Sequence, residues 1–136
     1  MKKMFLSVII AASLGMMQAS YAASVCDVKS NLKQARESLL AMLDEADKAK
    51  QDELKKKIDE ASNALEAALK TVEGDKEKAK QLEETWGALR KTRDEEIIPA
   101  IVAGQKDKAK ELATGVQAER IKTINGLLAE LGGDKC

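Results

Sequence analysis

Apolar residues recur every three to four positions in four long stretches of this 136-residue chain, over about 27–46, 53–72, 76–103 and 106–131. This spacing places the apolar side chains of each stretch on one face of an α-helix. The connections between the stretches are short, and short connections make consecutive helices antiparallel neighbours. The sequence therefore predicts an all-α fold, an antiparallel up-down-up-down four-helix bundle that forms one domain over residues 23–136.

Glycine, proline and charged residues mark where the predicted helices end. A charged break over 47–52 separates the first two helices. Gly74 is suited to a left-handed stop, and Asp75 is suited to the N-cap of the third helix. We expect Pro99 to kink the third helix near its end and Gly104 to terminate it. Two further glycines lie inside the fourth predicted helix and lower its helix propensity: Gly115 and Gly126.

The chain contains no histidine, which removes the commonest general base and the commonest metal ligand. Without histidine we find no nucleophile–base pair and no axial ligand for a cytochrome-like bundle. The 23 Lys and Arg residues balance the 23 Asp and Glu residues, and no basic block is present to bind a nucleic-acid backbone. We therefore expect no catalytic residue, no enzyme activity, no metal, no cofactor and no nucleic-acid partner.

The N-terminal segment has the pattern of a cleavable signal peptide. Lys2 and Lys3 form a positive start, and an apolar stretch over 5–17 follows. Ser20 and Ala22 place small residues at the two positions that define a cleavage site after Ala22. The alternative is an uncleaved membrane helix, but about 20 apolar residues are needed to span a bilayer. The sequence thus predicts cleavage of residues 1–22 and a periplasmic or secreted domain.

The two cysteines lie near the two ends of the predicted domain, at Cys26 and Cys136. In an oxidising compartment an even number of cysteines indicates a disulfide. An up-down-up-down bundle places its two termini at one end, which is what an internal Cys26–Cys136 bridge requires. The alternative is a frayed tail over 132–136 whose thiol pairs between two chains. We expect the internal bridge.

Three arginines interrupt the apolar rows of the predicted helices. Arg36, Arg93 and Arg120 each stand where an apolar residue would continue the row. At 1.5 Å per residue, Arg36 and Arg120 lie at about the same height, and Arg93 lies about one turn nearer the other end. Three inward guanidinium groups would form a fork-shaped site for a carboxylate, with Trp86 as a flat apolar wall beside them.

A structural interpretation of the same residues stays open. Arginine on the flank of a bundle commonly lays its stem over a seam and pairs with a carboxylate, and Trp86 would then belong to the core. The glutamates available for such pairs are Glu37, Glu66, Glu83, Glu96 and Glu119.

The segment over 93–109 resembles the turn between the third and fourth helices in the ligand-binding domain of methyl-accepting chemotaxis receptors. The matching features are Arg93, Pro99 with Ala100, Gly104 after the helix end, and Ala109 one turn into the next helix. The resemblance implies a sensor bundle outside the cytoplasm that binds small molecules between helices or at a dimer interface. It also implies that an arginine on the first helix meets the ligand carboxylate, and Arg36 is at the matching position.

These observations together predict an exported, chemoreceptor-like input module. Its partners would be a small, anionic molecule, such as an amino acid, an organic acid or an aromatic carboxylate, or an envelope sensor protein. The alternative is a ligand-free structural or chaperone-like helical protein of the cell envelope. The oligomeric state stays open between a monomer and a homodimer.

Overall fold

The computed structural model describes residues 11–136, with side chains from Ser24 onward. The described part is helical throughout and contains no strand. The helices, with one π turn (η1) and one 3-10 turn (η2), are α1 (Ala11–Leu43), α2 (Lys48–Leu69), α3 (Lys76–Thr92), η1 (Arg93–Ile97), α4 (Ile98–Val102), α5 (Lys106–Thr114), α6 (Val116–Glu130) and η2 (Gly133–Lys135). None of these described helices is long and apolar enough to cross a membrane.

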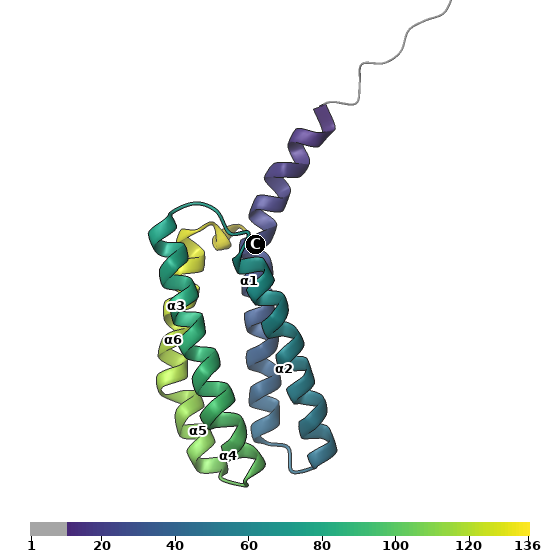
Figure 1. The fold of residues 1–136 in the computed structure, drawn as a ribbon, viewed down its shortest axis with the longest axis vertical. Coiled ribbons are helices and arrows are strands. Elements are labelled where there is room, and N and C mark those ends of the chain that lie inside the picture. Colours follow the sequence, from purple (N-terminus) through teal and green to yellow (C-terminus); the bar gives the residue numbers. More distant parts are fainter. Residues whose placement is uncertain (1–10) are drawn as a thin grey trace, which may run out of the picture.

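The helices form an antiparallel four-helix bundle with up-down-up-down connections, as the sequence predicts (Figure 1). α1 packs along α2, and α3 packs along α6, so the bundle consists of two helical hairpins. Residues 11–22 continue α1 beyond the bundle (Figure 1), whereas residues 1–10 of the expected signal peptide lie outside the described residues. Cleavage after Ala22 stays a prediction.

The charged break expected over 47–52 is wrong, because α2 already begins at Lys48. Asp47 is the N-cap of this helix, and its side chain accepts a hydrogen bond from the backbone N–H of Ala49. Gln51 is buried one turn later and donates to the carbonyl of Glu45. A capping aspartate and a buried glutamine therefore turn what looks like a polar linker into the first turn of a helix.

The third predicted helix contains a π turn that the sequence analysis did not anticipate. α3 ends at Thr92, the π turn η1 covers Arg93–Ile97, and α4 carries the chain to Val102. The N–H of Ile98 donates to the carbonyl of Arg93, five residues earlier. Pro99 has no N–H for the carbonyl of Glu95 and its ring crowds that carbonyl. The expected distortion at Pro99 is thus taken up in the wider turn that precedes it.

The turn after α4 has the predicted glycine stop. Gly104 has φ +79°, its N–H donates to Ile101 O, and the N–H of Gln105 donates to Ala100 O. This is the hydrogen-bond pattern of a Schellman motif, and the positive φ suits glycine. Gly74 also has a positive φ, and Asp75 caps α3 as expected.

The fourth predicted helix is broken at Gly115 into α5 and α6, which corrects the expectation of one continuous helix. Gly115 has φ −98° and ψ −101°, so it lies outside the helical region. The break changes which residues face inward. Val116, which the apolar row placed in the core, is 42% exposed, whereas Gln117 is only 3% exposed.

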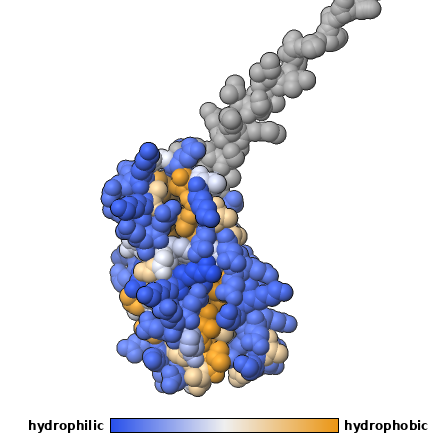
Figure 2. Space-filling model, viewed as in Figure 1, coloured by the Kyte–Doolittle hydropathy of each residue, from blue (hydrophilic) through white to orange (hydrophobic). Residues whose placement is uncertain are grey.

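The core is divided into two apolar clusters along the bundle axis. One cluster joins α1, α2, α3 and α6 at the end that carries the chain termini. The other joins α1, α2, η1, α4 and α5 at the far end. The buried polar residues Ser62, Arg93 and Gln117 lie on the elements between these clusters. The face seen in Figure 2 is largely hydrophilic, with hydrophobic residues gathered in a line between the two hairpins.

A disulfide joins Cys26 on α1 to Cys136 at the C-terminus, with their Cα atoms 5.5 Å apart. The pairing is within one chain, as the sequence predicts. The bridge fastens the start of the first hairpin to the end of the second at the terminal end of the bundle (Figure 1).

Candidate functional site

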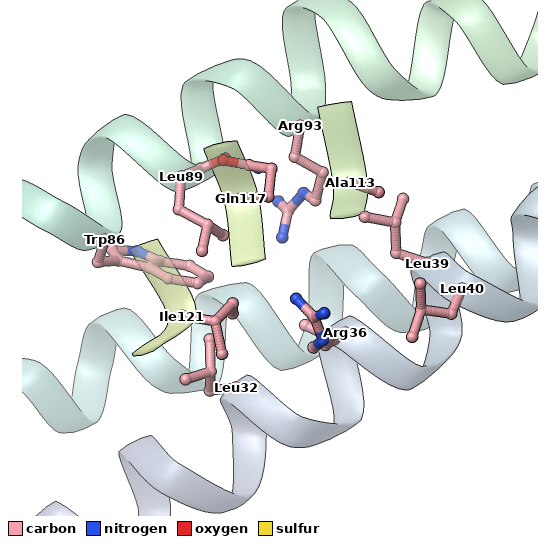
Figure 3. Close-up of a pocket in the computed structure, with 11 residues that line it drawn as sticks. Leu32, Arg36, Leu39, Leu40, Trp86, Leu89, Arg93, Ala113, Gln117 and Ile121 are labelled. Atoms are coloured by element: carbon pink, nitrogen blue, oxygen red, sulfur yellow. The ribbon is translucent and has the colours of Figure 1, made fainter. Parts of the chain in front are cut away.

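A cavity lies between the two apolar clusters, where α1 faces α3, α5 and α6 (Figure 3). Its empty volume is about 380 Å³, including the part that opens to solvent. Its lining consists of eight apolar residues and three polar ones: Leu32, Ala35, Arg36, Leu39 and Leu40 from α1, Trp86 and Leu89 from α3, Arg93 from η1, Ala113 from α5, and Gln117 and Ile121 from α6. Two of the three polar residues are arginines.

Arg93 is the most unusual residue of this lining because its side chain is almost completely buried, with 1% exposed. Its Nε donates to Asp94 Oδ1 at 2.9 Å, and its Nη1 donates to Ser62 Oγ at 2.7 Å. Its Nη2 is buried and has no hydrogen-bond partner among the described residues. An unpaired donor on a buried cation is energetically costly. The π turn starts at this residue, so the local widening of the helix positions the guanidinium group.

Arg36 faces Arg93 from the opposite side of the cavity. Figure 3 shows the two guanidinium groups pointing toward one another. Arg36 is half-buried, and within residues 24–136 it forms no hydrogen bond and no ion pair. The cavity therefore brings together two cations, and of the side chains described from Ser24 onward only Asp94 forms an ion pair with either of them. This arrangement has a local excess of positive charge and free donors.

Trp86 belongs both to the core and to the cavity wall. It is 3% exposed and packs within the terminal core cluster. The guanidinium carbon of Arg93 lies 5.8 Å from the centroid of its ring, which is a cation–π distance. Its indole N–H donates to Glu66 Oε1 at 3.1 Å, so the ring orientation is held from α2. The two interpretations of Trp86 from sequence are therefore compatible.

Arg120 does not line this cavity, in contrast to its expected position beside Arg36. Its Nη1 donates to Thr92 Oγ1 and Gln117 Oε1, both at 2.8 Å, and makes a longer contact of 3.4 Å with Ala88 O. These contacts connect α6 to α3. The height estimate for Arg120 is not the cause of this difference, because α6 is unbroken from Val116 to Glu130. The side chain misses the cavity because it is directed toward α3.

Gln117 is a lining residue that the sequence analysis missed. Its Nε2 donates to Leu89 O at 2.8 Å, and its Oε1 accepts from Arg120. Gln117 thus uses both ends of its amide to hold α6 against α3. Its only signal in the sequence is its position directly after Gly115-Val116, where a broken helix presents a new face.

The alternative of flank ion pairs describes Arg90 well, although Arg90 does not interrupt an apolar row. Arg90 Nη1 lies 2.5 Å from Glu66 Oε1, and Arg90 Nε lies 3.4 Å from Asp94 Oδ2. Of the five glutamates considered for such pairs, Glu66 is the one that pairs with an arginine, whereas Glu37 lies 4.0 Å from Lys33. The described residues give Arg36 and Arg120 no carboxylate partner.

The ion pair between Glu66 and Arg90 shifts both groups toward their charged forms. Partial burial alone would raise the pKa of Glu66, but hydrogen bonds from Arg90 and Trp86 and the attraction of Arg90 and Arg93 lower it below its ordinary value. Partial burial would likewise lower the pKa of Arg90, but its hydrogen bond to Glu66 and its attraction to Glu66 and Asp94 raise it. Both groups are therefore charged at neutral pH, and they brace Trp86.

A second, wider groove continues from the cavity toward the disulfide. It lies between α1 and α6 and shares Leu32, Arg36 and Ile121 with the cavity. Lys29 and Lys33 line it, so the approach to Arg36 is also basic. Among the described residues, no group of three or more Cys, Asp or Glu side chains is arranged to hold a metal ion.

Comparisons with known proteins identify the architecture. A family model described as a four helix bundle sensory module for signal transduction matches residues 17–133, which is most of the chain. The searches of curated proteins and of solved structures gave no match. The resemblance to the chemoreceptor sensor bundle is thereby confirmed. The chain belongs to the family of four-helix-bundle sensory modules for signal transduction.

Proposed function

We propose that this chain is an exported sensory module that binds a small anion between Arg36 and Arg93. The observation that carries the proposal is the pair of facing guanidinium groups, one of them buried with an unpaired Nη2. A carboxylate placed between them would accept hydrogen bonds from both and neutralise their mutual repulsion. Charge-assisted hydrogen bonds of this kind are stronger than neutral ones.

The geometry of the lining favours ligand binding with a local rearrangement. The enclosed cavity is small, about 20 Å³, so a ligand larger than a water molecule needs side chains to move. Arg36 is half-buried, has no partner among the described residues and stands between the cavity and the basic groove. Rotation of Arg36 toward the groove would admit the ligand, and its return would close the site. The free energy of this motion is small because no hydrogen bond is broken.

The location and the partner follow from the family and the N-terminal pattern. Modules of this family usually lie outside the cytoplasm, and the segment over 1–22 has the features of a cleavable leader. The bound form would then be recognised by an envelope sensor protein that carries the signal onward. Arg120 has no part in ligand binding in this proposal, because it connects α6 to α3.

A thermal-shift screen of the oxidised domain, 23–136, followed by calorimetry, tests the proposal. The panel contains organic acids, amino acids, aromatic carboxylates and the amides that correspond to them. A ligand at 100 times its Kd should stabilise the fold by about 2.7 kcal/mol, which raises Tm by several degrees. Arg36→Gln and Arg93→Gln should each weaken binding of the active compound at least about tenfold.

Lys91→Gln is the control, since it removes a positive charge from an exposed position on α3 outside the cavity and should leave the affinity within about threefold of wild type. Equal loss in all three variants would show a general electrostatic effect and contradict the site. A panel with no shift would favour the structural or chaperone-like interaction protein instead.

A further inference from the structure

The charged side chains that line the cavity are cations, and no carboxylate in the lining could pair with a bound cation. The charged residues of the lining are Arg36 and Arg93, and it contains no Asp or Glu. From this asymmetry we infer that the ligand is a carboxylate with an apolar body and no ammonium group, and that α-amino acids are excluded. The inference rests on the proposed function and narrows it to one chemical class.

The carboxylates nearest to the site are engaged outside it. Asp94 pairs with Arg93 and Arg90 through its two oxygens. Glu66 accepts from both Arg90 and Trp86 through the same oxygen. Neither residue lines the cavity. An ammonium group inside the cavity would therefore find no carboxylate to pair with.

The one uncharged polar side chain of the lining is also occupied. The amide oxygen of Gln117 accepts from Arg120, and its Nε2 donates to the carbonyl of Leu89. Leu89 O also accepts from the backbone N–H of Arg93. Gln117 Oε1 is therefore the side-chain acceptor of the lining, and it already accepts from the Arg120 guanidinium. An ammonium group bound to this oxygen would lie beside the Arg120 guanidinium, and the repulsion between the two cations disfavours it.

Electrostatics add to this exclusion. An α-ammonium lies within a few bonds of its own carboxylate, so binding would place it beside the two guanidinium groups. Like charges at such distances disfavour the bound form, and desolvation without a partner adds a further cost. Lys29 and Lys33 in the adjoining groove extend the positive potential along the approach.

The remaining surface of the cavity suits an apolar body. Leu32, Leu39, Leu89 and Ile121 surround the space, and the indole of Trp86 forms one wall (Figure 3). Apolar surface of this kind is best covered by an aliphatic or aromatic group. The carboxylate is held at the arginines, and the hydrocarbon part lies against these side chains.

Two matched pairs of compounds test the inference by calorimetry: 4-methylpentanoate against leucine, and phenylacetate against phenylglycine. The members of each pair differ only by the α-ammonium group. We expect the deaminated acid of at least one pair to bind at least about tenfold more tightly than its amino acid. The neutral 4-methylpentanamide and phenylacetamide should also bind at least about tenfold more weakly than the acids.

A variant that supplies the missing acceptor provides a second readout. Leu40 lines the cavity at its exposed edge, with 36% of its surface accessible, so a polar residue is tolerated there. Leu40→Glu should lower the preference for the acid over the amino acid by at least about threefold. Val102→Glu is the control, since it adds the same charge at an exposed apolar position outside the cavity and should keep the wild-type preference.

The outcomes separate this inference from the proposed function. If leucine and phenylglycine each bind as tightly as their deaminated acids, and Arg36→Gln weakens the binding of all four compounds, the inference is wrong and the anion site stands. The same holds if only inorganic anions bind in an Arg36-dependent way. If no anion binds, or if Arg36→Gln and Arg93→Gln leave every affinity unchanged, both proposals fail.

Discussion

Arg93 and Arg120 interrupt their apolar rows in the same manner, yet the structure gives them opposite surroundings. Arg120 satisfies Gln117 and Thr92 and links two helices. Arg93 is more deeply buried and keeps one nitrogen unpaired beside a second cation. Arg120 therefore stabilises the bundle, whereas in the proposed function Arg93 is stabilised by the bound anion.

This difference predicts opposite effects on stability when each arginine is replaced by methionine. Arg93→Met should raise the free energy of unfolding by about 1 kcal/mol without ligand, because a buried charge with an unpaired donor is removed. Ser62 still donates to Ile58 O, and Asp94 keeps Arg90, so neither partner is left unpaired. Arg120→Met should lower the free energy of unfolding by about 1–3 kcal/mol, because the buried Gln117 oxygen loses its donor.

Urea denaturation of both variants with the wild type as reference measures these changes. A loss of stability in Arg93→Met as large as that in Arg120→Met would show that Arg93 serves the fold and not a ligand.

The pKa of Glu66 predicts how the stabilising effect of the Glu66–Arg90 ion pair depends on pH. Because that pKa is lower in the folded than in the unfolded chain, the ion pair stabilises the fold fully at pH values above the pKa of Glu66 in the unfolded chain. This stabilisation is lost as the pH falls through the pKa of Glu66 in the folded chain. Glu66→Gln should cost about 0.5 kcal/mol at neutral pH, because the pair is partly exposed, and the difference from wild type should vanish in acid.

Unfolding free energies measured from neutral pH to about pH 3 test this behaviour. Glu84→Gln removes a charge from an exposed position on α3 and should show no such convergence. A constant difference between wild type and Glu66→Gln at every pH would contradict the assignment.

At the scale of the helices, two departures from regular geometry position the site. The π turn η1 begins at Arg93, and the break at Gly115 selects Gln117 as the inward residue of α6. α5 packs against the π turn, so the two irregular segments are neighbours in the bundle. The geometry of the cavity therefore depends on the residues that permit the π turn and the helix break, which are Pro99 and Gly115.

Two glycines of the fourth predicted helix are expected to respond oppositely to alanine. A Cβ at Gly115 would lie 2.8 Å from the carbonyl oxygen of Glu111, which is backbone and cannot move aside easily. Gly115→Ala should therefore destabilise the fold by about 1–2 kcal/mol. A Cβ at Gly126 meets nothing within 4 Å, so Gly126→Ala should stabilise it by about 0.5–1 kcal/mol.

Urea denaturation compares the two variants directly, and ligand affinity provides a second measurement. Gly126→Ala should leave the affinity unchanged because it lies in a regular part of α6, away from the cavity. A stabilising Gly115→Ala would show that the break is not required by the packing around it.

The number and order of the helices, the stop at Gly104 and the disulfide could be predicted because each has a local or compositional signal. The lining of the cavity could be predicted only in part. Arg36 and Arg93 could be identified because they interrupt apolar rows, and Trp86 because it is the single tryptophan of the chain. The inward position of Gln117 and the contact of Arg120 with α3 depend on how α6 is oriented after the break at Gly115. A glycine inside a helical pattern does not say whether the helix continues, because that depends on contacts with another helix.

At the scale of the whole molecule, the fold consists of two hairpins that are covalently closed by one disulfide. Cys26 and Cys136 are separated by 110 residues, so the bridge encloses almost the entire bundle. In the chain-entropy description, closing a loop of this length stabilises the folded state by about 4–5 kcal/mol. The bridge thus contributes a substantial part of the about 5–15 kcal/mol by which folded domains are stable.

Replacing both cysteines by serine should lower the free energy of unfolding by about 3–5 kcal/mol. Reductant should reduce the stability of the wild type to a similar degree and leave the double-serine variant unchanged, which controls for effects of the reductant itself. Urea denaturation with and without reductant measures both changes. Equal stability of oxidised and reduced wild type would contradict the large contribution of the bridge.

The position of the disulfide also determines where a movement of the two hairpins would be visible. The bridge holds the two hairpins together at the terminal end of the bundle, so any movement between them would be a rotation about that end. A small separation of the hairpins at the arginines is then magnified with distance from that end. It is greatest at the opposite tips, where Lys106 lies 3.0 Å from Asp44 across the two hairpins. If binding in the cavity separates the hairpins, the largest change in distance is therefore expected at those tips and the smallest at the joined termini.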